Sequence, residues 1–368
     1  MQACLLLIAA LLLAACAADG KPGNQPAAGG SGGAPTSAAG SGGSTTSTGG
    51  AGGAGLGSGG SAGAGAMMGD ASVDAGTSVD AGTSADAGMN ADAGSGERSV
   101  PYEPAPTKAF VEMNLYPGDP PNLLANAPKE TIEPTGRIHD VSVPTLRRYP
   151  LDESKATGTA FVVFPGGGYE TLNMEGHGAA LAQRLGPLGI AVFALKYRVG
   201  AGSMNVPRDA LLDAKRAVRL VRSKAAQWAL APNRIGVISY SAGSHLNMSL
   251  ISGFDLGQPA AADPVERMSC RPDFVASTCT WNYGNATSPF KFTASTPPVY
   301  LCHAQDDTTA PIALSTAIEQ QLKALGVLEH LEVYPSGGHD SFNVGLSHAG
   351  KDWPDKFLPW LKANQLTP

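Results

Sequence analysis

The stretch RIGVISYSAG, residues 234–243, joins an apolar, β-prone run to a turn of small residues, and a helical pattern follows at residues 244–251. A serine on a sharp turn between a strand and a helix has its hydroxyl exposed, as a nucleophile requires. Small residues are needed two positions before and two after it, because the strand and the helix approach closely there. Gly243 meets this requirement, whereas Ser239 stands where glycine is usual. By itself the motif fits a nucleophilic Ser241 and an ordinary helix N-cap serine equally well.

Apolar, β-prone runs alternate with helical patterns on both sides of this motif. Strands are expected at residues 161–164, 190–195, 234–239, 274–278, 299–303 and 331–334, and helices at residues 179–185, 208–230, 244–251 and 314–325. This alternation predicts an α/β fold with a mostly parallel central sheet and helices on both faces. In such sheets the functional residues lie on loops beyond the carboxyl ends of the strands.

Side chains of catalytic type follow two later strands. Asp306 and Asp307 come after one expected strand, and His339 follows the last one. The order Ser, Asp, His, with each residue on the loop after its own strand, predicts a catalytic triad. In this triad Ser241 attacks an acyl carbonyl, His339 transfers the proton, and an aspartate fixes the imidazole tautomer. Asp306 and Asp307 compete for the acid role, and the other one is expected to cap the helix after Pro311.

Glycines after an earlier strand offer backbone donors for the oxyanion of the tetrahedral intermediate. Residues Gly166-Gly167-Gly168 follow the strand at 161–164, and the N–H of Ala242 comes directly after the candidate nucleophile. Glycine enters loop conformations that direct N–H groups inward. A glycine run also fits a phosphate loop, but no Lys followed by Ser or Thr comes after it, which disfavours nucleotide binding.

Seven short motifs occur in order between Phe110 and Leu361: Pro165-Gly166-Gly167-Gly168-Tyr169, Glu175-Gly176, Leu195-Lys196-Tyr197-Arg198, Arg234-Ile235-Gly236, Ser241-Ala242-Gly243, Ser269-Cys270-Arg271-Pro272-Asp273-Phe274 and Gly337-Gly338-His339. Together they resemble the α/β-hydrolase superfamily, and specifically the esterase/lipase branch that contains acetyl-xylan-esterase-like proteins. The resemblance therefore implies an α/β-hydrolase fold. Two departures from the family pattern are Ser239 and the residues Asp340-Ser341-Phe342 after the histidine.

The resemblance also implies a serine esterase without a cofactor. The residues that it assigns are the nucleophile Ser241, the base His339, the acid Asp307 and the oxyanion donors Gly167, Gly168 and Ala242. The implied substrates are small acyl esters, with acetylated plant polysaccharide as the favoured class. The alternative is a catalytically silent protein of the same fold that binds carbohydrate or another surface. A serine peptidase would fit the same triad, but the chain has no length for the added propeller or large lid of such enzymes.

The N-terminal residues are typical of an export signal. Residues Leu5–Ala15 form an apolar run of eleven residues, too short for a bilayer, which needs about 20. The run ends in Leu13-Ala14-Ala15-Cys16, which resembles a bacterial lipobox whose cysteine is acylated. We therefore expect a lipoprotein signal peptide at residues 1–16, and a lipid anchor at Cys16 that holds the protein in the bacterial cell envelope, at the outer membrane or cell surface. Secretion without an anchor is the alternative.

A linker follows at residues 17–99, rich in Gly, Ala and Ser and without any aromatic residue. Such a segment cannot bury enough apolar surface to offset its conformational entropy, so we expect it to be disordered. Its later part carries a six-residue repeat with one Asp each, as in Ser72–Thr77. One carboxylate per repeat is too few for a calcium array. The folded domain is expected at residues 100–368.

Charge and metal-ligand patterns exclude other functions. After residue 98 the chain has 24 acidic and 23 basic side chains, so the domain carries no basic footprint for nucleic acid. The histidines have no carboxylate or cysteine partners at the spacing of metal ligands, so no metal is expected. Cys270, Cys279 and Cys302 are an odd number, which leaves open whether one pair forms a disulfide in an exported protein.

Four more residues are weighed for a role at the site. Trp281 and Tyr283 follow the strand at residues 274–278, so they either stack on a sugar ring at the site or close the core. His245 lies in the helix after Ser241, where burial is favoured over contact with substrate. His177 is expected to be a surface or loop residue.

Overall fold

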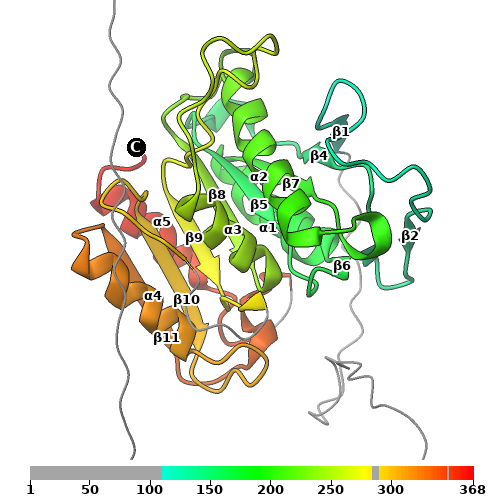
Figure 1. Cartoon of the computed structure of the whole chain (residues 1–368). Coiled ribbons are helices and arrows are strands. Elements are labelled where there is room, and N and C mark those ends of the chain that lie inside the picture. Colours follow the sequence, from blue (N-terminus) through cyan, green and yellow to red (C-terminus); the bar gives the residue numbers. More distant parts are fainter. Residues whose placement is uncertain (1–109, 284–289, 346–347) are drawn as a thin grey trace, which may run out of the picture. The chain divides into compact units, whose positions relative to one another are not determined.

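A computed structural model describes residues 110–283, 290–345 and 348–368 (Figure 1). The predicted signal peptide, Cys16 and the predicted linker at residues 17–99 lie outside these ranges. Within them, no helix is long and apolar enough to cross a membrane.

The main sheet has eight strands in the order β1-β4-β7-β5-β8-β9-β10-β11. Their bounds are β1 Val111–Asn114, β4 Thr145–Arg148, β5 Ala160–Phe164, β7 Ala191–Lys196, β8 Ile235–Tyr240, β9 Val275–Thr278, β10 Val299–Ala304 and β11 Glu329–Tyr334. β4 is antiparallel to both of its neighbours, and all other neighbouring strands pair in parallel. A second, small sheet contains β2 Thr131–Ile132, β3 Ile138–His139 and β6 Thr171–Leu172. The predicted mostly parallel sheet is confirmed.

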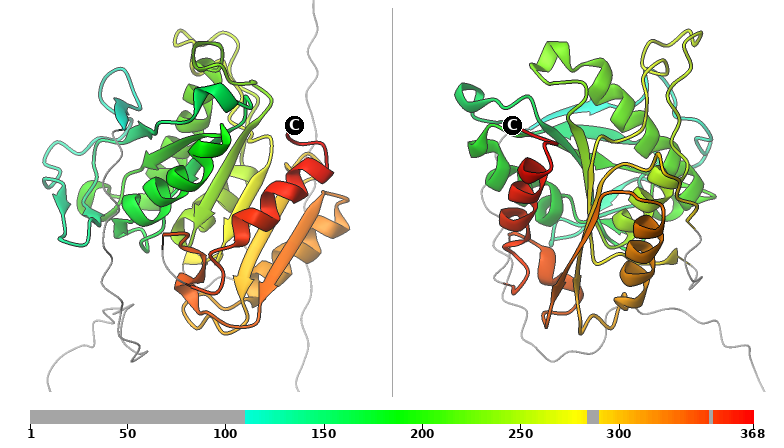
Figure 2. Two further views of the ribbon diagram at one scale, coloured as in Figure 1. Left: turned by 180° about the vertical axis from the view of Figure 1, so that it is seen from behind. Right: turned by 90° about the vertical axis from the view of Figure 1, so that its left-hand side faces the viewer.

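Helices cover both faces of the main sheet (Figure 2). They are α1 Ala180–Leu185, α2 Val206–Ser223, α3 Ala242–Ser252, α4 Ala313–Ala324 and α5 Trp353–Ala363. α1 and α5 lie on one face, and α2, α3 and α4 lie on the other (Figure 2). This double cover explains the sequence of the central strands, because every residue of β5, β7 and β8 is buried. A strand with apolar layers on both sides has no reason to alternate polar and apolar residues.

The helix expected at residues 208–230 is shorter than predicted. α2 begins after Asn205, whose side chain accepts a hydrogen bond from the N–H of Arg208, and it ends at Ser223. The chain then forms a short 3₁₀ turn at Ala226–Trp228 and a left-handed residue at Ala229. Apolar residues still occur at helical intervals after α2 ends, because residues such as Trp228 pack against the sheet: the Trp228 ring lies on Phe193, with 4.9 Å between ring centroids. Burial alone therefore extends the helical pattern beyond the helix.

Candidate active site

Ser241 occupies a strained turn between β8 and α3. Its backbone has φ 52° and ψ −119°, a conformation that a non-glycine residue adopts only where the surroundings enforce it. Its N–H donates to the carbonyl of Thr278 on the neighbouring strand at 3.2 Å. Gly243 lies where a Cβ atom would come within 2.2 Å of the Phe164 carbonyl oxygen. The small-residue requirement after the serine is therefore a direct consequence of how closely α3 passes β5.

Ser239, the departure from glycine before the turn, is accommodated by its own hydrogen bonds. The side chain is fully buried, and its hydroxyl donates to the Ala276 carbonyl at 3.1 Å. The same oxygen accepts from Asn247 Nδ2 on α3 at 3.0 Å. The hydroxyl thus joins β8, β9 and α3 instead of forcing them apart. Serine fits here because polar partners surround it.

The structure brings the three predicted triad residues together from the ends of three strands. Nε2 of His339 lies 2.8 Å from Ser241 Oγ, and Nδ1 of His339 lies 2.8 Å from Asp307 Oδ2. An ionised carboxylate can only accept, so Nδ1 carries the proton and Nε2 is free to accept from the serine hydroxyl. This is the tautomer that a serine nucleophile needs from its base.

The Asp307 carboxylate is almost completely buried and heavily hydrogen-bonded. Its Oδ1 accepts from the N–H groups of Thr309 and Ala310 at 2.9 and 2.8 Å. Behind it, His303 donates through Nε2 to the Ala310 carbonyl at 2.6 Å and lies 3.4 Å from Asp307 Oδ2. Burial alone raises the pKa of Asp307, but hydrogen bonds from His303, His339 and the Ala310 N–H outweigh it and hold the pKa well below its usual range. Asp307 therefore stays ionised beside the imidazole.

Asp306 does not cap the helix after Pro311, so that prediction is wrong. α4 has no side-chain cap. The N–H groups of Thr309 and Ala310, just before α4, donate to Asp307, and Pro311 has no N–H. Asp306 points the other way and accepts from the backbone N–H groups of Gly337 and Gly338, at 3.1 and 2.8 Å.

The glycine loop after β5 presents unused backbone donors beside Ser241. Gly167 and Gly168 have φ values of 140° and 65°, which favour glycine, and a Cβ on Gly167 would come within 2.2 Å of the Thr171 carbonyl oxygen. Within the described ranges, the N–H groups of Gly167, Gly168 and Ala242 donate to no protein acceptor. They are the three predicted oxyanion donors. The neighbouring Gly166 is packed against Ser241, since a Cβ there would come within 3.0 Å of Ser241 Cβ.

His177 is not the surface residue expected from the sequence. Its ring stacks on Tyr240, with centroids 4.2 Å apart and an interplanar angle of 3°. Its Nδ1 accepts from the N–H of Gly166 at 3.0 Å, so the neutral ring carries its proton on Nε2. Burial, together with the positive charge of Arg137, lowers the pKa of His177 to about 3. Only the fold shows that His177 accepts a hydrogen bond from Gly166, because His177 lies on a π-helical turn at Met174–Ala179 that the sequence pattern does not predict.

Known esterases resemble this chain in sequence and fold. Residues 149–258 match the family model BD-FAE. The acetyl ester-xyloside bifunctional hydrolase from Caldicellulosiruptor lactoaceticus is 29% identical, with a TM-score of 0.57 over 72% of this chain and 98% of that one. The carboxylesterase Cest-2923 from Lactobacillus plantarum shares the fold at 16% identity, with a TM-score of 0.53 over 65% of this chain and 98% of that one.

The chain has the α/β-hydrolase fold. Among curated proteins it is 28% identical to an acetylxylan esterase from Xylanibacter ruminicola over 200 residues, which are 50% of this chain and 41% of that protein. It spans less than half of the length of each curated relative that it matches. The predicted fold, and the predicted resemblance to acetyl-xylan-esterase-like carboxylic ester hydrolases, are confirmed.

Aromatic rings gather beside the glycine loop. Tyr169, directly after Gly168, is buried, and its hydroxyl lies 2.9 Å from His245 Nδ1. Burial lowers the pKa of His245 to about 4. The Tyr283 ring lies 5.6 Å from Tyr169 and 6.0 Å from Trp281, and Tyr283 is 49% exposed. His245 is thus buried as expected, and Tyr283 presents an exposed aromatic ring beside Tyr169, which follows the glycine loop.

The three cysteines of the domain are buried free thiols. Cys270, Cys279 and Cys302 form no disulfide in the structure. The disulfide that the sequence left open is therefore absent among these three cysteines. In the part of the chain that the structure describes, no cluster of His, Cys, Asp and Glu could hold a metal ion.

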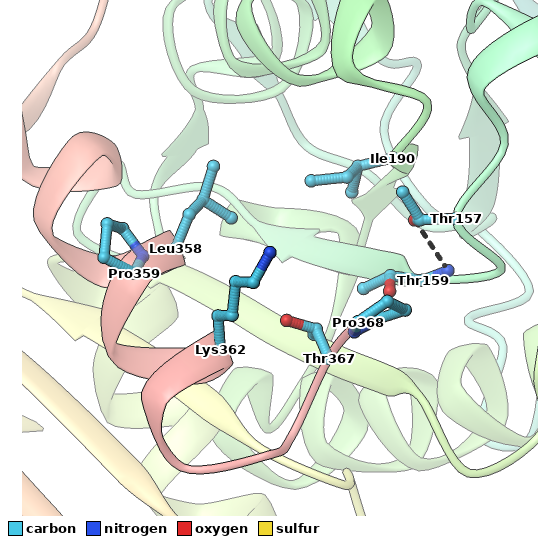
Figure 3. Close-up of a pocket in the computed structure, with 8 residues that line it drawn as sticks. All are labelled: Thr157, Thr159, Ile190, Leu358, Pro359, Lys362, Thr367 and Pro368. Atoms are coloured by element: carbon cyan, nitrogen blue, oxygen red, sulfur yellow. Dashed lines mark hydrogen bonds between the residues drawn. The ribbon is translucent and has the colours of Figure 1, made fainter.

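A cavity of about 310 Å³ lies away from the triad (Figure 3). It is lined by Thr157, Thr159, Ile190, Leu358, Pro359, Lys362, Thr367 and Pro368. Thr159 and Ile190 directly precede β5 and β7, so the cavity lies at the amino ends of these strands. The triad lies at the carboxyl ends, the opposite edge of the sheet. This cavity is separate from the candidate active site.

Proposed function

We propose that this protein is an exported serine esterase that removes acetyl groups from plant polysaccharide through an acyl-serine intermediate. The observation that carries the catalytic part is the continuous chain of contacts Ser241–His339–Asp307, with 2.8 Å at each step, beside unused backbone donors. A protein that only binds a surface has no need of this arrangement.

The geometry supports two successive acyl transfers. Ser241 Oγ attacks the ester carbonyl carbon while His339 Nε2 takes its proton, and the carbonyl oxygen becomes an oxyanion at the free N–H groups of the glycine loop. The C–O bond to the alcohol breaks, and His339 returns the proton to the departing oxygen. Water then attacks the acyl-serine with His339 again as base, which releases acetate and restores Ser241.

The acetylated polysaccharide is proposed on two supports. One is the likeness to proteins named acetylxylan esterase and acetyl ester-xyloside hydrolase. The other is the exposed ring of Tyr283 beside Trp281, a surface on which a pyranose can stack. Export rests on the lipobox-like Leu13-Ala14-Ala15-Cys16.

Hydrolysis of p-nitrophenyl acetate by the full chain tests the catalytic part. Ser241→Ala and His339→Ala are expected to lose turnover and, for the serine variant, labelling by a fluorophosphonate. Ser249→Ala is a matched control, because its hydroxyl bonds only to the carbonyl of His245 within α3. A folded wild type that neither turns over the ester nor takes the label would favour a carbohydrate-binding surface instead.

Release of acetate from acetylated xylan tests the substrate. We expect Tyr283→Ala to lower the ratio of activity on xylan to activity on p-nitrophenyl acetate, because the small ester does not reach an aromatic platform. An unchanged ratio would argue against sugar stacking at Tyr283.

Fractionation of cells tests the anchor. The wild type is expected in the membrane fraction and the Cys16→Ser variant is expected to lose acylation, measured by incorporation of labelled palmitate. Equal labelling of both proteins would contradict a lipid anchor at Cys16.

A further inference from the structure

Two adjacent carboxylates on the loop after β10 hold the loop that carries His339. Asp307 Oδ2 meets the imidazole at 2.8 Å. Asp306 accepts from the two successive backbone N–H groups of Gly337 and Gly338, one on each oxygen. One aspartate thus contacts the ring of the histidine, and the other contacts the backbone immediately before it.

The turn at Gly337 and Gly338, which is hydrogen-bonded to Asp306, has little conformational preference of its own. Gly337 has φ 133° and Gly338 has φ 63°, regions that glycine enters freely and other residues avoid. Two consecutive glycines leave the direction of the following residue poorly defined by local sterics. The conformation must therefore be set by contacts from elsewhere in the fold.

This turn has one contact from a distant part of the chain, made by Asp306, and one local contact, made by Ser341. Asp306 binds the two N–H groups, and Ser341 Oγ donates to the Gly338 carbonyl at 3.1 Å. A Cβ on Gly337 would come within 2.0 Å of Ser341 Oγ, so the turn is also closely packed against the residues after His339. The carboxylate is exposed, so these hydrogen bonds, and not burial of the side chain, are its contribution to the fold.

We propose that Asp306 is a positioning residue for the catalytic histidine: by clamping the N–H groups of Gly337 and Gly338 it fixes the turn from which His339 reaches both Ser241 and Asp307. The proposal rests on the proposed esterase function. Asp306 touches neither substrate nor the reacting atoms, and it acts only through the backbone that precedes His339.

The expected effect falls on turnover and not on substrate binding. A displacement of the imidazole by about 1 Å is enough to lower the rate by about 100-fold. We therefore expect Asp306→Ala to lower kcat for p-nitrophenyl acetate by about 10- to 100-fold, with KM close to that of the wild type. Asp306→Asn keeps one oxygen acceptor for the two N–H groups, so its kcat is expected between those of Asp306→Ala and the wild type. Gln305→Ala, which removes the neighbouring exposed side chain, is the matched control.

A second readout on the full chain reports the position of His339 without any turnover. The imidazole N–H that faces Asp307 gives a far-downfield proton NMR signal, assigned by its absence in His339→Ala. We expect this signal in the wild type and in Gln305→Ala, and a broadened or lost signal in Asp306→Ala at unchanged circular dichroism.

The proposal is overturned if Asp306→Ala keeps both the wild-type kcat and the wild-type imidazole signal, or if its loss of activity only follows a loss of folded protein. A wild type that shows the imidazole signal but hydrolyses no ester would refute the esterase function. The signal in Asp306→Ala would still decide the positioning role in that case.

Discussion

Replacement of Ser239 by glycine restores the residue usual in the family, and we predict that it destabilises this protein. Ser239 is fully buried, and its oxygen is the acceptor for Asn247 Nδ2 at 3.0 Å. In Ser239→Gly the Asn247 amide N–H remains buried without an acceptor. Within the described residues, Asn247 Oδ1 already has no hydrogen-bond partner, so turning the amide over recovers nothing.

The size of the effect follows from these contacts. A buried donor that loses its acceptor costs about 1–3 kcal/mol. A glycine inside a strand costs roughly a further 0.5–1 kcal/mol in conformational entropy. The expected loss in the free energy of unfolding is therefore about 1.5–4 kcal/mol. The turnover of the folded fraction should not change, because the Ser239 hydroxyl points to α3 and β9 and not to the triad.

Equilibrium unfolding in urea, with kcat measured on the same samples, checks this prediction. Ser239→Ala should lose the hydrogen bond without the glycine penalty and so fall between the two proteins. Adding Asn247→Leu to Ser239→Gly removes the orphaned amide and should recover part of the loss. If Ser239→Gly were as stable as the wild type, the hydrogen-bond account of Ser239 would be wrong. If it gained turnover, Ser239 would be shown to lower the activity of the wild type.

Three further predictions concern the turn between β8 and α3, the glycine loop after β5 and the pH dependence of stability. Gly243→Ala places a Cβ 2.2 Å from the Phe164 carbonyl; we expect lower turnover and a loss of about 1–3 kcal/mol in unfolding free energy, whereas Gly118→Ala, where a Cβ meets nothing within 4 Å, should show neither change. Gly167→Ala forces the loop away from Thr171 and should lower kcat by about 100- to 1,000-fold, the usual cost of an oxyanion donor, at unchanged circular dichroism; wild-type kcat would mean that Gly167 supplies no donor. The unfolded chain protonates His177 and His245 near pH 6.5, whereas in the folded state their pKa values are about 3 and about 4. The unfolded state therefore binds more protons over this window, and the free energy of unfolding should fall as the pH is lowered from 6.5 towards 4. The fall should be shallower in His177→Gln, measured as the urea midpoint against pH, and parallel curves for the two proteins would contradict it.

Much of the candidate site could be predicted because parallel strands bring their carboxyl ends to one edge. Once the strands at residues 234–239, 299–303 and 331–334 are recognised, Ser241 and His339 must lie near each other. The small residue two positions after Ser241 is predictable for a local reason, since a Cβ on Gly243 would come within 2.2 Å of the Phe164 carbonyl oxygen. These inferences need only strand order and residue size.

The roles of Asp306 and Asp307 could not be separated in this way. They are neighbours on one loop, and local spacing treats them alike. In the structure their side chains diverge, so that one meets the imidazole and the other meets the glycine turn. The difference depends on the path of a loop some thirty residues further along the chain.

The sequence by itself determined the α/β class, the order of the triad and the glycine loop, because these depend on short-range pattern and on the direction of parallel strands. Only the tertiary structure decided that the Ser239 hydroxyl accepts a hydrogen bond from Asn247, that His177 accepts one from Gly166 in the glycine loop, and that the cysteines are free. Each of these outcomes is a contact between elements distant in the chain. Hydrogen bonds and ring stacking are short-ranged and directional, so residue type and spacing cannot specify them until the fold has placed both partners.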